Sequence, residues 1–181
     1  KNSIRATGVA LHTGLKVNLM LHPAEVDTGI VFSRTDLPGC VSFPARTGAV
    51  GNTRMVTTLC SNEHQLSTVE HLLWALSGLG IDNAVVEVDG GKLPIMDGSA
   101  APFVFLLQSA GVKPQRAAKK FLRMLLPLSV SDDGASAALE PYEGFRLNYT
   151  LEYDHPVFAA HAHTVCVEFS TTSFVTKVSP A

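Results

Sequence analysis

Residues 67–72, Ser67-Thr68-Val69-Glu70-His71-Leu72, decide how this chain is interpreted. Apolar residues recur there at helical spacing, so the sequence predicts an amphipathic helix over 67–78, ended by Gly78 and Gly80: Val69, Leu72, Leu73, Leu76 and Leu79. Successive helical residues point about 100° apart, so Glu70 and His71 can both reach one cleft. A carboxylate and an imidazole are the general base and the zinc ligand that metal hydrolases need most.

The same stretch also matches a capping box, because Ser67-x-x-Glu70 precedes an apolar run. In that alternative the serine hydroxyl caps a backbone N–H and the glutamate reaches back to the cap residue. A single histidine such as His71 is also more often a half-buried helix residue than a ligand. The local pattern does not decide between a capping role and a chemical one.

The composition is typical of a globular chain with a real core: 181 residues, 46% hydrophobic and 17% charged. The net charge of −2 and the lack of a long Lys/Arg run argue against nucleic acid or an anionic membrane as the main partner. No apolar run approaches the ~20 residues of a membrane span. Three widely spaced cysteines, Cys40, Cys60 and Cys166, predict no disulfide framework and favour a cytoplasmic location. Both ends of the chain look cut.

The first part of the chain alternates strand and helix patterns. Alternating residues predict strands over 17–21 and 30–32, and AVVEV at 84–88 predicts another. The stretch KLPIMDGS at 92–99 is typical of a loop, and Pro102–Ala110 of a helix that ends before Gly111. The sequence thus predicts a complete α+β domain over 1–118, with a sheet layered against two helices.

Strand patterns return after a polar link at 111–120. A hairpin is predicted for 128–130 and 135–139 around Asp132-Asp133-Gly134, followed by strands over 145–153 and 165–169. A helix could begin within 171–178. We therefore expect residues 119–181 to be the incomplete start of a second, similar α+β domain.

Four blocks in order resemble one family: Ala6–Gly14 (ATGVALHTG), Ser67–Leu72 (STVEHL), Gly78–Asn83 (GLGIDN) and Pro94–Ala100 (PIMDGSA). A fifth, Asp154-His155-Pro156, follows later. Together they resemble the UDP-3-O-acyl-N-acetylglucosamine deacetylases, the zinc amidases of lipid A biosynthesis in Gram-negative bacteria. The resemblance covers essentially the whole chain.

The resemblance implies two similar α+β domains with an active site between them. The first domain would supply Glu70 as general base and His71 as one ligand of Zn²⁺. The second would supply a His and an Asp ligand and a catalytic histidine, all beyond Ala181. This chain is therefore expected to hold half of a split site and to be inactive alone. Its implied partners are a UDP-linked acylated glucosamine and the missing second domain.

The resemblance also assigns Leu11, His12 and Met55 to the substrate side of the site. A turn residue is the simpler interpretation of His12. Plain core is the alternative for Leu11 and Met55, and for Leu11 it is at least as good as a role in the site. Asp97 lies in a Met-Asp-Gly turn, where a structural role is expected. The pair His161-x-His163 could share a cation if it lies on a strand, although a surface role is simpler.

An alternative function stays open at this point. The chain could be a noncatalytic α+β domain in which Glu70 is only a helix-capping residue. Similar strand and helix layering occurs in RNA-binding and kinase domains, which is an analogy of fold alone.

Overall fold

The computed structural model describes residues 1–152 and 164–180, and they form two compact units. The first consists of Lys1–Ala117 with Phe174–Ala181, and the second of Ala118–Ser173. The last eight residues thus group with the first unit, whereas the sequence placed them in a second domain beginning at 119.

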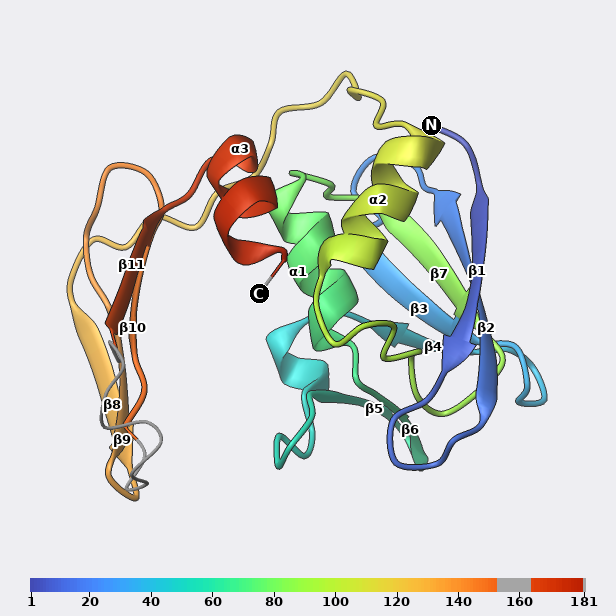
Figure 1. Cartoon of the computed structure of the whole chain (residues 1–181). Helices are drawn as coiled ribbons and strands as arrows, with labels where there is room; N and C mark the ends of the chain where they lie inside the picture. The colour runs from blue at the N-terminus through green and yellow to red at the C-terminus, as the bar shows by residue number, and fades with distance from the viewer. Residues whose placement is uncertain (153–163, 181) are drawn as a thin grey trace. The chain divides into compact units, whose positions relative to one another are not determined.

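A mixed five-stranded sheet forms the framework of the first unit (Figure 1). Its strands are, in spatial order, β1 (Ile4–Val9), β2 (Lys16–Pro23), β7 (Ala84–Val88), β3 (Ile30–Arg34) and β4 (Val41–Pro44). β3 and β7 are parallel and all other neighbours are antiparallel. The strands predicted over 17–21, 30–32 and 84–88 are confirmed.

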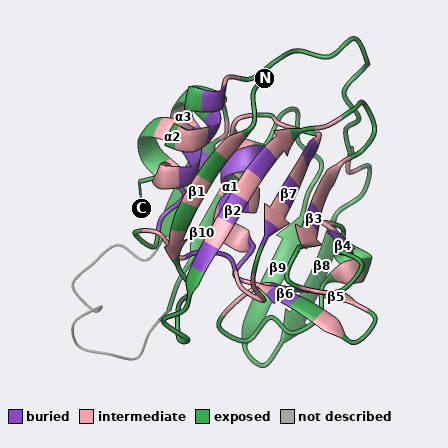
Figure 2. Cartoon of the chain, turned by 90° about the vertical axis from the view of Figure 1, so that its right-hand side faces the viewer, coloured by how far each residue is buried: buried purple, intermediate pink, exposed green. Residues whose placement is uncertain are grey.

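Two helices, α1 (Glu70–Gly78) and α2 (Ala101–Ala110), cover one face of this sheet (Figures 1 and 2). Alternate residues of β2 and β7 are buried beneath them: Val17, Leu19, Leu21, Ala84, Val86 and Val88. Leu72 and Leu76 of α1 and Phe103 of α2 complete this apolar layer. The predicted α+β fold, a sheet layered against two helices, is confirmed.

The predicted start of α1 is wrong by three residues. Ser67 is the last residue of β6 (His64–Ser67), which pairs with β5 (Thr58–Ser61). Ser67 N donates to the Gly91 carbonyl at 3.0 Å, and Leu93 N donates to the Ser67 carbonyl at 3.0 Å. These bonds to a distant segment hold Ser67 in extended backbone, so the helix begins only at Glu70. By contrast, α2 begins one residue before the predicted Pro102.

The chain's last residues pack against α1 within the first unit. Phe174 begins a π-helical turn, Phe174–Val178, directly after α3 (Thr171–Ser173). Its ring is fully buried and stacks on Trp74, with ring centroids 6.4 Å apart. A Cβ atom added at Gly78 would lie 2.1 Å from this ring, so the close approach requires glycine there.

A short 3-10 turn at Thr47–Ala49 precedes β5.

The second unit contains two antiparallel pairs of strands among its described residues. β8 (Leu128–Asp132) pairs with β9 (Ala135–Leu139), and β10 (Arg146–Thr150) with β11 (Thr164–Glu168). Asp133 and Gly134 both have positive φ, as a tight hairpin turn requires, which confirms the predicted turn. Within the described residues, the strand predicted over 145–153 covers only 146–150. Every residue of β8 and β9 is exposed (Figure 2).

Candidate active site

The predicted site residues come from loops at one end of the first unit. The β1–β2 loop, the loop before β5, the β7–α2 loop and the start of α1 all lie toward its lower end in Figure 1. The structure thus gathers the blocks that carry Leu11, Met55 and Glu70 at one end of the sheet.

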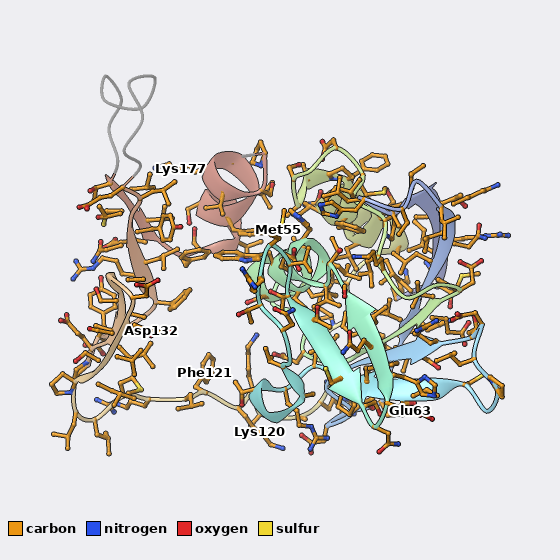
Figure 3. The ribbon with its side chains drawn as sticks, turned by 90° about the horizontal axis from the view of Figure 1, so that it is seen from below. Met55, Glu63, Lys120, Phe121, Asp132 and Lys177 are labelled. Atoms are coloured by element: carbon orange, nitrogen blue, oxygen red, sulfur yellow. The ribbon has the colours of Figure 1, made fainter. Side chains whose placement is uncertain are left out.

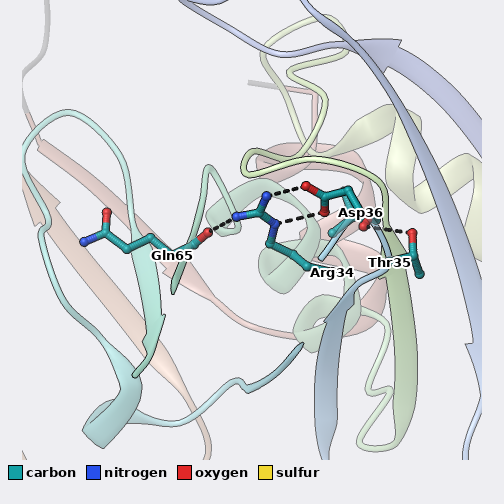
Figure 4. Close-up of polar contacts among 5 residues, drawn as sticks. Arg34, Thr35, Asp36 and Gln65 are labelled. Atoms are coloured by element: carbon teal, nitrogen blue, oxygen red, sulfur yellow. Dashed lines mark hydrogen bonds and ion pairs between the residues drawn. The ribbon is translucent and has the colours of Figure 1, made fainter. Parts of the chain in front are cut away.

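The β5–β6 hairpin, which leads into α1, is fastened to the main sheet by Arg34 (Figure 4). The Nε and Nη2 atoms of Arg34 both donate to the Asp36 carboxylate, and Nη1 donates to the Gln65 carbonyl at 3.1 Å. The hydrogen bond from Arg34 holds the pKa of Asp36 below its ordinary value, although partial burial opposes this. The fork therefore joins the end of β3 to β6, close to the segment that turns into Glu70.

Glu70 is held by a backbone donor from another segment. Its Oε2 atom accepts a hydrogen bond from Thr57 N at 3.0 Å, and the Thr57 carbonyl accepts one from Thr68 N at 3.1 Å. Thr57 thus connects the loop before β5 to Thr68, just before α1, and to Glu70, the first residue of α1. One carboxylate oxygen is fixed in direction by this N–H.

The capping-box alternative is wrong in this structure. The residue that caps α1 is Val69, which makes no side-chain capping bond. The Ser67 hydroxyl instead pairs with the Thr58 hydroxyl at 3.0 Å across the β5–β6 hairpin. The serine lies in the wrong element for a cap, and the glutamate points to Thr57.

His71 is the second residue of α1 and is half-buried. The β7–α2 loop carries Asp97, whose carboxyl pKa lies below its ordinary value. The larger causes of that lowering are hydrogen bonds from the Ser99 N–H, at 2.9 Å, and the Ser99 hydroxyl, at 2.8 Å. The structural turn predicted at Asp97 is therefore confirmed.

Leu11, His12 and Met55 are exposed residues, so the core alternative for Leu11 and Met55 is wrong. Leu11 is 42% exposed and Met55 87% exposed, and Figure 3 shows Met55 on the loop before β5. His12 lies in the β1–β2 turn with φ 71°. Exposed apolar side chains at a loop end are available to contact a ligand.

The described residues supply one candidate metal ligand, not a set. Within 1–152 and 164–180 no three His, Cys, Asp or Glu side chains come together as a metal site would require. The pair His161 and His163, and the block at 154–156, lie outside the described residues. An imidazole such as that of His71 fits zinc chemistry, but as one member of a larger set.

Two residues at the site gave no sequence signal. Thr57 acts through its backbone N–H, which any residue except proline carries, so no side-chain pattern could have revealed it. Thr68 has φ 64°, a left-handed conformation that is rare for a β-branched residue. The motif containing Thr68 was visible, but its backbone conformation was not.

Comparison with known proteins decides the family. A family model described as "LpxC: UDP-3-O-acyl N-acetylglycosamine deacetylase" matches residues 1–181. The chain belongs to this family. Two curated relatives named UDP-3-O-acyl-N-acetylglucosamine deacetylase, from Saccharophagus degradans and Pseudomonas entomophila, are 56% and 54% identical to it over 181 residues. The match covers all of this chain and 60% of each relative.

Membership of the family is consistent with the α+β layering described above. Within the described residues, no helix combines the length and the apolar character that crossing a membrane requires.

Proposed function

We propose that this chain carries the Glu70–His71 part of a zinc-dependent amide hydrolase. The substrate is UDP-3-O-(3-hydroxyacyl)-N-acetylglucosamine, and the products are the free amine and acetate, at the committed step of lipid A biosynthesis. The observation that carries the proposal is the Thr57 N–H on Glu70 Oε2, which directs a carboxylate beside an imidazole at a helix start. Family membership supports it.

Glu70 is the proposed general base. The Thr57 N–H fixes one carboxylate oxygen, which leaves the other free to accept a proton from water. The helix start adds a favourable field for the negative charge.

His71 is the proposed zinc ligand of this chain. Zinc, when bound, lowers the pKa of a coordinated water and polarises the amide carbonyl. A catalytic zinc site uses three protein ligands, so in this proposal the rest come from the further length that the relatives have. The 181-residue chain alone is therefore inactive in the proposal.

Leu11, His12 and Met55 are proposed to contact the substrate, because they are exposed at the same end of the unit as Glu70.

All three cysteines are free thiols, which supports a cytoplasmic location.

Zinc-binding calorimetry on the 181-residue chain, beside a His71→Ala control, tests how much of the metal site is present. We expect weak or absent binding, because one imidazole does not hold zinc tightly. Tight one-to-one binding that His71→Ala abolishes would contradict the split site, and would direct a search for further ligands to His12, His161 and His163.

Glu70→Gln in the full-length protein tests the general base. We expect kcat to fall by roughly 10²–10⁴-fold while bound zinc is retained. The matched control is Glu63→Gln, an exposed glutamate in the turn of the β5–β6 hairpin (Figure 3), which should keep kcat. A normal kcat in Glu70→Gln removes Glu70 from the mechanism.

A further inference from the structure

Thr68, between β6 and α1, combines two unfavourable features. Its φ of 64° lies in the left-handed region, which glycine, asparagine and aspartate adopt far more readily than a β-branched residue. Asn62 and Asp133, which have positive φ in ordinary hairpin turns, are residue types suited to it. Backbone strain of this kind persists where the surroundings enforce it and is concentrated at functional sites.

The second feature is the Thr68 hydroxyl. The residue is 2% exposed, and Oγ1 has no hydrogen-bond partner among the described residues. The other buried polar residues of the described chain are all paired. Thr58 bonds to Ser67, Ser99 to Asp97, and Ser179 to the Val175 carbonyl. A buried hydroxyl is normally satisfied, so the one on Thr68 points to a partner other than the described residues.

Thr68 and Glu70 are joined to the same residue. Thr68 N donates to the Thr57 carbonyl, and Thr57 N donates to Glu70 Oε2. Thr68 and Glu70 therefore belong to one hydrogen-bonded cluster around Thr57 at the start of α1. Buried waters typically bind about three polar groups that the protein leaves unsatisfied.

We propose that Thr68 Oγ1 and the Glu70 carboxylate together hold an ordered water molecule, which makes Thr68 a positioning residue for Glu70. The inference rests on the proposed role of Glu70 as general base. Thr57 N–H and this water then fix the carboxylate from two directions. This role would account for a threonine at a position whose left-handed backbone conformation glycine adopts at lower cost.

Thr68→Val and Thr68→Ser in the full-length protein separate the hydroxyl from the shape of the side chain. Valine keeps the branched shape and removes the hydroxyl, whereas serine keeps the hydroxyl. We expect Thr68→Val to lower kcat roughly tenfold or more, with KM, zinc content and melting temperature nearly unchanged. Thr68→Ser should retain most of the wild-type kcat.

Thr58→Val is the matched control, a buried threonine in the adjoining β5–β6 hairpin whose hydroxyl has a protein partner. It should lower the melting temperature, because Ser67 loses its partner, and keep kcat. High-resolution crystal structures of the wild type and Thr68→Val provide a readout independent of activity. A water between Thr68 Oγ1 and Glu70 is expected in the first and not in the second.

Three outcomes overturn the proposal: wild-type kcat in Thr68→Val, equal loss of kcat in both variants, or a wild-type crystal structure without this water. Failure of the proposed function looks different. In that case Glu70→Gln keeps full activity, while the crystal structures still report whether the water is there.

Discussion

Both compact units contain antiparallel strand pairs, but they differ in what covers the strands. In the first unit, alternate residues of β2 and β7 are buried under α1 and α2. In the second, every residue of β8 and β9 is exposed, and large apolar residues such as Phe121 and Leu122 are 81% and 94% exposed. Strand pairing by itself therefore buries little, and the apolar layer under the helices supplies the core of this chain.

The strongest test of this comparison is amide hydrogen exchange across the 181-residue chain. Amides of β2 and β7 should be protected at least ~10³-fold more than those of β8 and β9, because only the former lie over a buried core. Limited proteolysis should likewise cleave within 119–152 and spare 1–118. Equal protection in both units would contradict the comparison.

Core truncation should have a large effect in the first unit and a negligible one in the second. Leu72→Ala removes a fully buried side chain and should lower the free energy of unfolding by about 2–5 kcal/mol. Leu139→Ala, in β9 at 54% exposure, should change it by less than about 0.5 kcal/mol. Urea unfolding followed by circular dichroism measures both, and similar values would show that burial does not separate the units.

Gly78→Ala tests whether the final residues belong to the first unit in solution. The added methyl group would overlap the buried Phe174 ring, so we expect a destabilisation of about 1–3 kcal/mol. Ser77→Ala, at the exposed neighbouring position, is the control and should be nearly neutral. In a Phe174→Ala background the penalty of Gly78→Ala should vanish, and its persistence would separate Phe174 from α1.

The smallest expected effects on stability come from one polar pair in each unit, Arg34–Asp36 in the first and Tyr142–Glu168 in the second. The Arg34–Asp36 fork lowers the folded-state pKa of Asp36, so its stabilisation is fully present above the unfolded-state pKa of about 3.9. It is lost as the pH falls through the lower folded-state value. Asp36→Asn should therefore remove about 1 kcal/mol at pH 7 and progressively less as the pH drops below about 4.

The second unit offers the counterpart to that fork. A hydrogen bond to Glu168 raises the pKa of the exposed Tyr142 hydroxyl. Tyr142→Phe should leave the urea midpoint unchanged, because a solvent-exposed pair contributes little. A pH-independent effect of Asp36→Asn, or a clear shift in Tyr142→Phe, would contradict this contrast.

The sequence by itself determined the elements whose pattern is local. AVVEV became β7, the Asp133-Gly134 dipeptide formed its hairpin turn, and the helix ending before Gly111 is present. The side chains Glu70 and His71 were also visible as candidates. Periodicity and turn chemistry depend on neighbouring residues, so one sequence is enough to predict them.

Only the tertiary structure decided how those side chains are used. Ser67-x-x-Glu70 satisfied the local capping pattern, yet Ser67 pairs with Thr58 and Gly91, and Glu70 with Thr57. The strain and the unpaired hydroxyl of Thr68 arise from the same long-range contacts. A hydrogen bond between segments distant in sequence depends on how the whole chain packs, and a short motif carries no information about its partner.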